Sequence, residues 1–288
     1  MSDTQPAYAK PTCFDVEIAD HVAHIKLNRP EKLNAMNRAF WHELPAIVRD
    51  INDNARARCI VVSSTGKHFS AGMDLSVFTD GSSMISAGAM DHAIRGEALR
   101  AHIKHLQDTF SCLDEARMPV LVAIQGGCIG GAIDMTSACD IRYCTADAFF
   151  CIQEINIGIT ADVGTFPRLC KLIPEGQVRE MAYTGRRMPA ARALAIGLVN
   201  QVYPDHASMM TSVLATAREI ATKNPVAVTG SKVMINYARD HSIKDGLDYI
   251  AVWQAGMLAR EHMQEAFAAQ AEKRPARFPG LAAHGKGV

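Results

Sequence analysis

Up to about residue 204, short apolar runs alternate with longer segments of helical periodicity. Strands are predicted at residues 14–18, 22–27, 59–63, 120–124 and 140–144, the first two as a hairpin. Apolar residues three or four positions apart predict helices at about residues 38–52, 91–116, 163–171, 176–184 and 190–197. Asn37 is a candidate N-cap for the first helix, and Pro45 inside it predicts a kink or a later start. This alternation indicates an α/β core.

The pattern changes beyond residue 204. Residues 206–272 are predicted to form three consecutive helices, the last of them over about residues 244–272. We therefore expect a core, residues 1–204, that carries the functional site, and a helical region, residues 205–288. Residues 76–90 are rich in Ser and Gly and lack periodicity, which predicts a mobile loop near a binding site.

Composition excludes several classes of protein. Hydrophobic residues make up 48% of the chain and charged residues 21%, which is typical of a soluble protein with a large core. Thirty basic residues balance thirty acidic ones, which argues against nucleic-acid or membrane-surface partners. The eight cysteines form no CxxC pair, which favours reduced thiols. No run reaches the ~20 apolar residues of a membrane span. The polar N-terminus and the C-terminal HGKGV predict a cytoplasmic location.

The chemistry is concentrated between residues 126 and 164. Three acidic residues lie in apolar sequence here: Asp134, Glu154 and Asp162. Carboxylates in apolar surroundings are costly to bury unless they are paired or functional. For Asp162 alone, a helix N-cap is an equally good interpretation. Asp140 and Arg142 are interpreted as a structural ion pair.

Two glycine turns can each present a backbone N–H to one oxygen atom. They are Ala71-Gly72-Met73 and Gly130-Gly131, and the second lies at a predicted helix start, where free N–H groups favour negative charge. Two such donors would stabilise a carbonyl oxygen that becomes an enolate. Each turn taken alone is also compatible with a purely structural role.

Other nucleotide and catalytic motifs fit less well. Glu154 follows the glycines by about 20 residues, as a ribose-binding acid would, but Cys128 occupies the place of the second glycine of GxGxxG. Residues 66–68 lack the Ser or Thr of a P-loop, and no GxSxG is present. His102 and His105 have no third ligand, so no metal site is predicted.

Four motifs carry a resemblance to a known family. NRPEKLNAMN, FSAGMDL, IQGGCIGGAIDM and ACDIRYCTADAFF resemble the crotonase (enoyl-CoA hydratase/isomerase) family, and the similarity runs from about Phe14 to Glu272. The segment EINIGITADVGTFPRL is similar to the family's Δ3,5-Δ2,4-dienoyl-CoA isomerase branch. The resemblance implies an α/β fold with a spiral core of ββα turns, and C-terminal α-helices that form trimers, which pair as hexamers.

The resemblance also implies the site. The substrate would be an acyl-CoA thioester whose carbonyl oxygen accepts hydrogen bonds from the N–H groups of Met73 and Gly131. Substrate and CoA contacts would come from Lys32, Leu33, Ala35, Ala71, Gly72, Asp74, Leu75 and Gly130. No metal or redox cofactor is implied, since CoA is part of the substrate. Ala132, where the family often has a third glycine, is a departure that leaves the donor Gly131 in place.

The implied reaction is isomerisation of a 3,5-dienoyl-CoA to a 2,4-dienoyl-CoA in fatty-acid β-oxidation. Glu154 would remove the C2 proton, Asp162 would deliver a proton to C6, and Asp134 would position Glu154 or raise its pKa. The alternative enzyme is an enoyl-CoA hydratase, in which Asp134 and Glu154 activate a water. A catalytically inactive scaffold is the third possibility, against which the three carboxylates argue.

Overall fold

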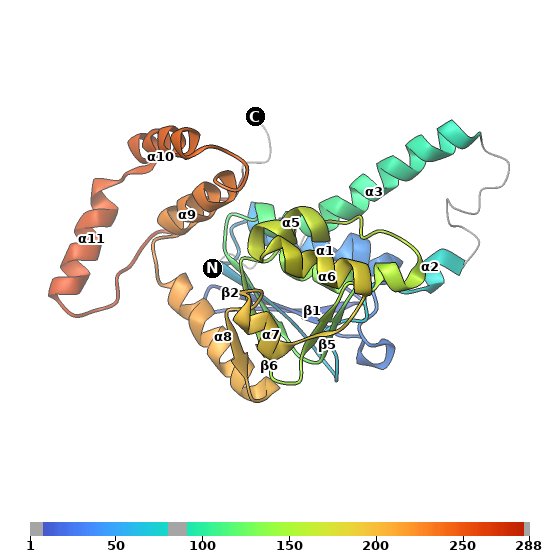
Figure 1. Cartoon of the computed structure of the whole chain (residues 1–288). Helices are drawn as coiled ribbons and strands as arrows, with labels where there is room; N and C mark the ends of the chain where they lie inside the picture. The colour runs from blue at the N-terminus through green and yellow to red at the C-terminus, as the bar shows by residue number, and fades with distance from the viewer. Residues whose placement is uncertain (1–7, 80–90, 285–288) are drawn as a thin grey trace.

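The structure, a computed structural model, describes residues 8–79 and 91–284 of the chain (Figure 1). Its main sheet has the strand order β1-β2-β3-β4-β6-β9 and contains β1 (Phe14–Ala19), β2 (Val22–Leu27), β3 (Cys59–Ser64), β4 (Val120–Ile124), β6 (Ile141–Thr145) and β9 (Gln201–Tyr203). Strands β1 and β2 form an antiparallel hairpin, and all later neighbours are parallel. The predicted strands and the hairpin are confirmed.

A second sheet was not predicted from the sequence. It joins β5 (Gly127–Ile129), β7 (Phe149–Cys151) and β8 (Met188–Pro189). Strands of two or three residues are too short to show a period of two, so only pairing in three dimensions defines them. The sheet positions the site because β5 leads directly into the Gly130-Gly131 turn.

The helices of the core lie close to their predicted positions. They are α1 (Arg38–Asp53), α2 (Ser76–Thr79), α3 (His92–Glu115), α4 (Gly131–Ser137), α5 (Thr165–Leu172), α6 (Glu175–Thr184) and α7 (Ala190–Ala195), with 3₁₀ turns η1 (Pro30–Lys32) and η3 (Glu154–Ile157). Helix α1 starts where the Asn37 side chain accepts the Phe40 N–H, and it continues through Pro45. In the predicted loop 76–90, residues 76–79 form α2 and residues 80–90 lie outside the described residues.

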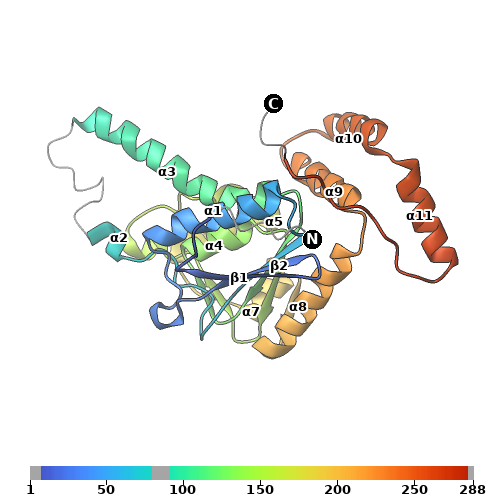
Figure 2. The ribbon, with the colours of Figure 1, turned by 180° about the vertical axis from the view of Figure 1, so that it is seen from behind.

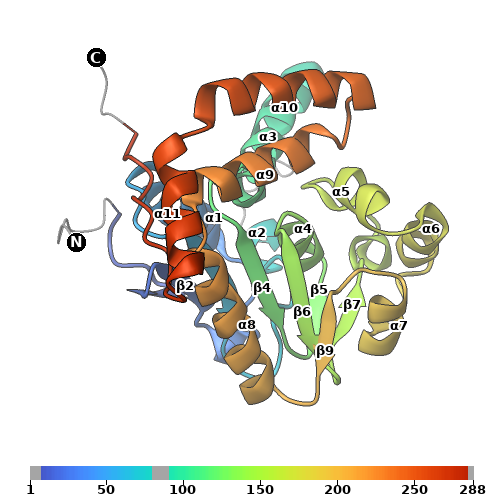
Figure 3. The ribbon, with the colours of Figure 1, turned by 90° about the vertical axis from the view of Figure 1, so that its left-hand side faces the viewer.

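The main sheet is covered on both faces. Helices α1 and α3 pack on one face (Figure 2) through side chains such as Phe40 and Phe110, which meet Ile60 and Val62 of β3 in one core. On the other face, α8 packs against the alternate β3 residues, among them Val61 (Figure 3). Both cores therefore follow from the period of two along buried strands.

The C-terminal region contains four helices, not the three predicted. They are α8 (His206–Ala221), α9 (Pro225–Tyr237), α10 (Ile243–Met257) and α11 (Arg260–Ala271). The predicted helix over residues 244–272 breaks at Leu258, which is extended with ψ 109°. Met257 and Leu258 are adjacent and cannot continue one apolar helix face. Helices α9–α11 extend away from the sheet (Figure 1), and no helix in the described parts of the chain is long and apolar enough to span a membrane.

Helix α9 is joined to the core by a buried lysine. Lys232, 7% exposed, donates to Asp140 Oδ2 at 2.8 Å and to the carbonyl oxygens of Leu113 and Met118. The predicted Asp140–Arg142 ion pair is therefore wrong, since Arg142 donates to backbone carbonyl groups instead. A buried ammonium group needs this full set of acceptors to offset its desolvation.

Candidate active site

The two predicted glycine turns lie side by side. Ser70 and Cys128 form a parallel bridge, and a Cβ on Gly72 would lie 2.5 Å from Ile129 O and 3.2 Å from Gly131 N. Gly72 also has φ +82°, so only glycine allows this approach. The structure thus brings together two turns that are about sixty residues apart in the sequence.

Two backbone N–H groups remain available at this junction. Met36 forms a parallel bridge with Met73: the Met36 N–H donates to Gly72 O, and the Asp74 N–H donates to Met36 O. The N–H of Met73 takes no part in this bridge. Gly131 is the first residue of α4, where an N–H has no partner within the helix. Neither amide donates a hydrogen bond within the described residues. A Cβ on Gly131 would lie 3.9 Å from Met73 N, so the two donors share one small space.

Asp134 lies three residues further along α4 and is 0% exposed. Its Oδ1 accepts hydrogen bonds from Thr165 N at 2.6 Å and Thr165 Oγ1 at 2.7 Å, whereas its Oδ2 is buried without a partner in the described residues. The pKa of Asp134 is raised to about 6, chiefly by burial and also by the charge of Asp162, while the Thr165 hydrogen bonds and Arg168 oppose the rise. One oxygen is held and the other is free for chemistry.

Glu154 opens the 3₁₀ turn η3, and its carboxylate lies against the Gly130 turn. A Cβ on Gly130 would lie 3.2 Å from Glu154 Oε1, and Gly130 has φ +55°. Glu154 Oε2 is buried without a partner in the described part of the chain. Burial, followed by the charge of Asp134, raises the pKa of Glu154 to about 7. Such a carboxyl group is suited to accept and release protons near neutral pH.

Asp162 is the most exposed of the three carboxylates, although its carboxyl group is still partly shielded from water. It does not cap α5, whose N-cap is Gly164, so the N-cap interpretation is wrong. Its backbone carbonyl accepts a hydrogen bond from Gln107 on α3 at 2.7 Å. Partial burial raises its pKa, and its charge contributes to the raised pKa values of Asp134 and Glu154. The three predicted carboxylates are therefore electrostatically coupled.

The predicted CoA residues lie on loops that meet beside these turns. Leu33 has a left-handed backbone conformation with φ 52°, and its carbonyl oxygen accepts a hydrogen bond from Ala71 N at 3.0 Å. The Asn34 amide holds the same loop by donating to the carbonyl oxygens of Thr65 and His68. Asp74 has a structural contact, since its Oδ1 accepts from the Ser76 N–H and hydroxyl at the start of α2.

A cavity of about 490 Å³ adjoins the junction of the turns. Its lining includes Leu33, Ala71 and Ile129, and also residues that were not predicted from the sequence: Lys67, His68, Gly126, Asp147, Phe149 and Arg187. The Arg187 guanidinium lies 4.4 Å from the centre of the Phe149 ring. Lys67 and His68 directly precede the FSAGMDL motif and were considered only against a P-loop. Arg187 follows a predicted helix and had none.

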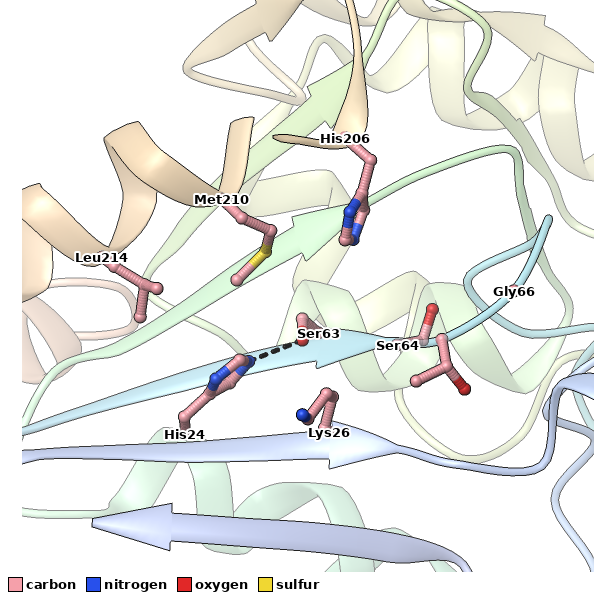
Figure 4. Close-up of a pocket in the computed structure, with 9 residues that line it drawn as sticks. His24, Lys26, Ser63, Ser64, Gly66, His206, Met210 and Leu214 are labelled. Atoms are coloured by element: carbon pink, nitrogen blue, oxygen red, sulfur yellow. Dashed lines mark hydrogen bonds between the residues drawn. The ribbon is translucent and has the colours of Figure 1, made fainter. Parts of the chain in front are cut away.

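Another cavity, of about 530 Å³, lies on the α8 side of the sheet (Figure 4). His24 Nε2 and Ser63 Oγ are hydrogen-bonded there at 2.7 Å, and Lys26 and His206 also line the cavity. None of the predicted site residues lines it. The register places Asp15 and Glu17 of β1 opposite Lys26 and His24, so its basic groups are offset by acidic neighbours. Two predicted site residues, Leu33 and Ala71, line the other cavity instead.

Within the described residues, no group of three His, Cys, Asp or Glu side chains is placed to hold a metal ion. The chain belongs to the enoyl-CoA hydratase/isomerase family, whose sequence pattern matches residues 17–280. This confirms the resemblance and the fold class predicted from the sequence.

Individual members of the family show which branch this chain is most similar to among those compared. The chain is 45% identical to the mitochondrial Delta(3,5)-Delta(2,4)-dienoyl-CoA isomerase of Rattus norvegicus over 88% of this chain and 77% of the relative. It is 39% identical to the peroxisomal enzyme of the same name from Arabidopsis thaliana, over 90% and 93%. The crystal structure of an enoyl-CoA hydratase from Bacillus anthracis superposes with a TM-score of 0.82 at 29% identity, covering 94% of this chain and all of that one.

The expected cytoplasmic location is wrong. It rested on the composition of the two ends of the chain, whereas these similar isomerases are named as mitochondrial or peroxisomal proteins.

Replacing Glu154 with Gln is expected to raise the melting temperature at about pH 8 and to leave it nearly unchanged at about pH 5. Burial raises the folded-state pKa of Glu154 from 4.5 to about 7, so the stability gained from the protonated form is present below about pH 4.5 and is lost as pH rises through 7. Gln is neutral throughout and should recover roughly 2 kcal/mol at the higher pH. Thermal melts across this range, with the exposed Glu97→Gln as control, measure the difference. A gain independent of pH would contradict the prediction.

Proposed function

We propose that this protein isomerises 3,5-dienoyl-CoA thioesters to 2,4-dienoyl-CoA thioesters, the step that β-oxidation needs for such dienes. The observation that carries the proposal is a combination of four groups without hydrogen-bond partners among the described residues: the N–H groups of Met73 and Gly131, and one buried carboxylate oxygen each on Asp134 and Glu154. Buried polar atoms without protein partners are expected where a substrate supplies the missing contact. The similarity to dienoyl-CoA isomerases supports the same substrate class.

The thioester carbonyl oxygen would accept hydrogen bonds from Met73 N and Gly131 N. This makes the C2 protons acidic, because the charge that develops on the oxygen meets donors already in place. Glu154 then takes one C2 proton, since burial and the charge of Asp134 raise its pKa to about 7, close to the pH at which a general base must work. The electrons of the broken C2–H bond form the C2–C3 double bond and move along the diene.

The reaction is completed at the far end of the diene. The π electrons of the C3–C4 double bond form the C4–C5 double bond, and those of the C5–C6 double bond form the new C6–H bond with a proton from Asp162. One proton leaves C2 and one arrives at C6, so substrate and product have equal mass. The raised pKa of Asp162 helps it to carry that proton. Asp162 is more exposed than Asp134 and Glu154, which suits an acid that must act several ångströms from C2. Asp134 acts on Glu154 through its charge.

The CoA part of the substrate would occupy the cavity beside the turns. Lys32, Leu33, Ala35, Ala71, Gly72, Asp74, Leu75 and Gly130 belong to the loops around it. Lys67 and Arg187 in its lining add two cations that suit phosphate groups. No metal or redox group enters any step, since CoA is part of the substrate.

An assay with two substrates tests the proposal. The pure protein is incubated separately with a 3,5-dienoyl-CoA and a 2-enoyl-CoA, and product mass and ultraviolet absorbance are recorded. A conjugated 2,4-dienoyl product of unchanged mass supports the isomerase. A water adduct of the enoyl substrate, with the diene untouched, would identify a hydratase that uses Asp134 and Glu154 on a water. Inactivity toward both would leave an inert scaffold.

We also propose that α10 and α11 mediate assembly into a trimer or hexamer. Large apolar side chains are exposed along α10, among them Ile243 (85% exposed), Leu247, Ile250 and Val252. Soluble monomers rarely expose contiguous apolar patches of this kind. This supports an oligomerisation role for the outer part of the predicted region 205–288, whereas α8 packs against the sheet and belongs with the core of residues 1–204.

Leu247→Glu is expected to shift the protein to smaller species, because a charge would be buried without a partner at the contact. Light scattering coupled to gel filtration measures the mass. Lys244→Glu, an exposed change of charge on the same helix, is the matched control and should leave the mass unchanged. If Leu247→Glu retains the mass of the unaltered protein, α10 is not the contact surface.

A further inference from the structure

The N-terminus of helix α5 is capped by the Asp134 side chain of helix α4. Its N-cap residue, Gly164, makes no side-chain cap hydrogen bond, and the first N–H of the helix, that of Thr165, donates to Asp134 on α4. The Thr165 hydroxyl donates to the same carboxylate oxygen at 2.7 Å. Both side chains are buried. One residue, 31 positions downstream, thus supplies both hydrogen bonds that hold Asp134 Oδ1.

The start of α5 is itself held in place. Gly164 has φ +137°, and a Cβ there would collide with the Arg168 guanidinium group, which covers the turn. Arg168 in turn donates to Ser111 Oγ on α3 at 3.1 Å. The N–H and hydroxyl of Thr165 therefore approach Asp134 from a fixed direction, and Asp134 Oδ2 is the oxygen left without a partner.

We propose that Thr165 is a positioning residue that holds the negative charge on Asp134 and so makes Glu154, rather than Asp134, the carboxylate that takes up the proton. The inference rests on the proposed function, because it explains how two neighbouring acids divide their roles. Hydrogen bonds to an ionised carboxylate favour its charged form, and a charged neighbour disfavours ionisation of the second acid. Thr165 is bonded to only one of the two acids.

The charged and titratable groups around the pair are consistent with this division. The charge of Asp162 raises the pKa of Asp134, and the charge of Arg168 lowers it. The charges of Asp134 and Asp162 both raise the pKa of Glu154. The nearby thiols are Cys128 beside Asp134 and Cys151 beside Glu154, and burial raises the pKa of each. The two Thr165 hydrogen bonds therefore keep Asp134 the more easily ionised of the pair, which titrates as a coupled unit.

The test compares Thr165→Val with Thr165→Ser. Valine keeps the shape and the backbone N–H but removes the hydroxyl, so Asp134 retains its proton more often and Glu154 loses its own at lower pH. We expect the acid limb of the kcat/KM–pH profile to move down by roughly one pH unit and kcat to fall about tenfold, with KM little changed. Thr165→Ser restores the hydroxyl and should keep the limb where it is in the unaltered protein.

A second readout does not depend on activity. Infrared titration of the full chain follows the carboxyl C=O bands, assigned with Glu154→Gln and Asp134→Asn. In Thr165→Val the Asp134 band should persist to higher pH and the Glu154 band should vanish at lower pH. If these shifts occur in a protein that does not isomerise dienes, the positioning role stands and the proposed function falls.

Two results would overturn the proposal. One is a pair of bands that does not move in Thr165→Val while thermal melts show a folded protein. The other is a kcat/KM–pH profile whose maximum is lowered equally in the Val and Ser variants and whose acid limb does not move. That pattern indicates a purely structural defect.

Discussion

Asp162→Asn is expected to abolish isomerisation while leaving binding of the thioester intact. Loss of a positioned general acid costs typically 10²–10⁴-fold in rate. In the proposed mechanism Glu154 serves as the base at C2 and Asp134 acts on Glu154, so neither delivers the proton to C6. The neutral amide keeps the size of the side chain. Turnover of a 3,5-dienoyl-CoA, together with its dissociation constant, separates the two effects.

A finer measurement isolates the step that Asp162 performs. Glu154 remains in Asp162→Asn, so the variant should still exchange the C2 hydrogen of the substrate with deuterated water, which mass spectrometry detects without any isomerisation. Glu154→Gln should lose exchange and isomerisation together. Asp248→Asn, an exposed aspartate on α10, is the control. Unchanged turnover in Asp162→Asn would remove this residue from the mechanism.

The elements that could be predicted from the sequence are those long enough to repeat their pattern. Strand β4 matches its prediction residue for residue, and the helix predicted at residues 91–116 is α3, His92–Glu115. Strands β5 and β7 have three residues each, and their identity depends on pairing with each other. The tail helix was predicted as continuous because apolar spacing continues through residue 257, where no Pro stops it.

The candidate site residues can be named from the sequence, but their contacts cannot. Glycine turns and carboxylates are visible as local motifs, and the structure brings Gly131 beside Met73 and couples Asp134 to Glu154. The partner of Asp134 is Thr165, 31 residues away, and the partner of Asp140 is Lys232. Local sequence carries no information on such distances. The order in which the acids ionise likewise depends on burial, which only the fold determines.

Gly131→Ala is expected to lower kcat/KM by about 10²–10³-fold, the cost of losing an oxyanion donor. The new methyl would lie 3.9 Å from Met73 N and 3.2 Å from Met36 Sδ, in the space where the thioester oxygen must sit. Alanine favours a helix start at least as well as glycine does, and the flexible Met36 side chain can yield, so the fold should persist.

Free CoA provides the discriminating control for Gly131→Ala, because it has no thioester carbonyl. Its dissociation constant, measured by calorimetry, should be unchanged in the variant while turnover of the dienoyl thioester collapses. Gly176→Ala on α6, where an added Cβ meets nothing within 4 Å, is the matched glycine substitution and should keep full activity. Equal losses in CoA affinity and in turnover would mean that the methyl disturbs the loops rather than the oxygen site, and the paired donors would then not be the origin of the acidity at C2.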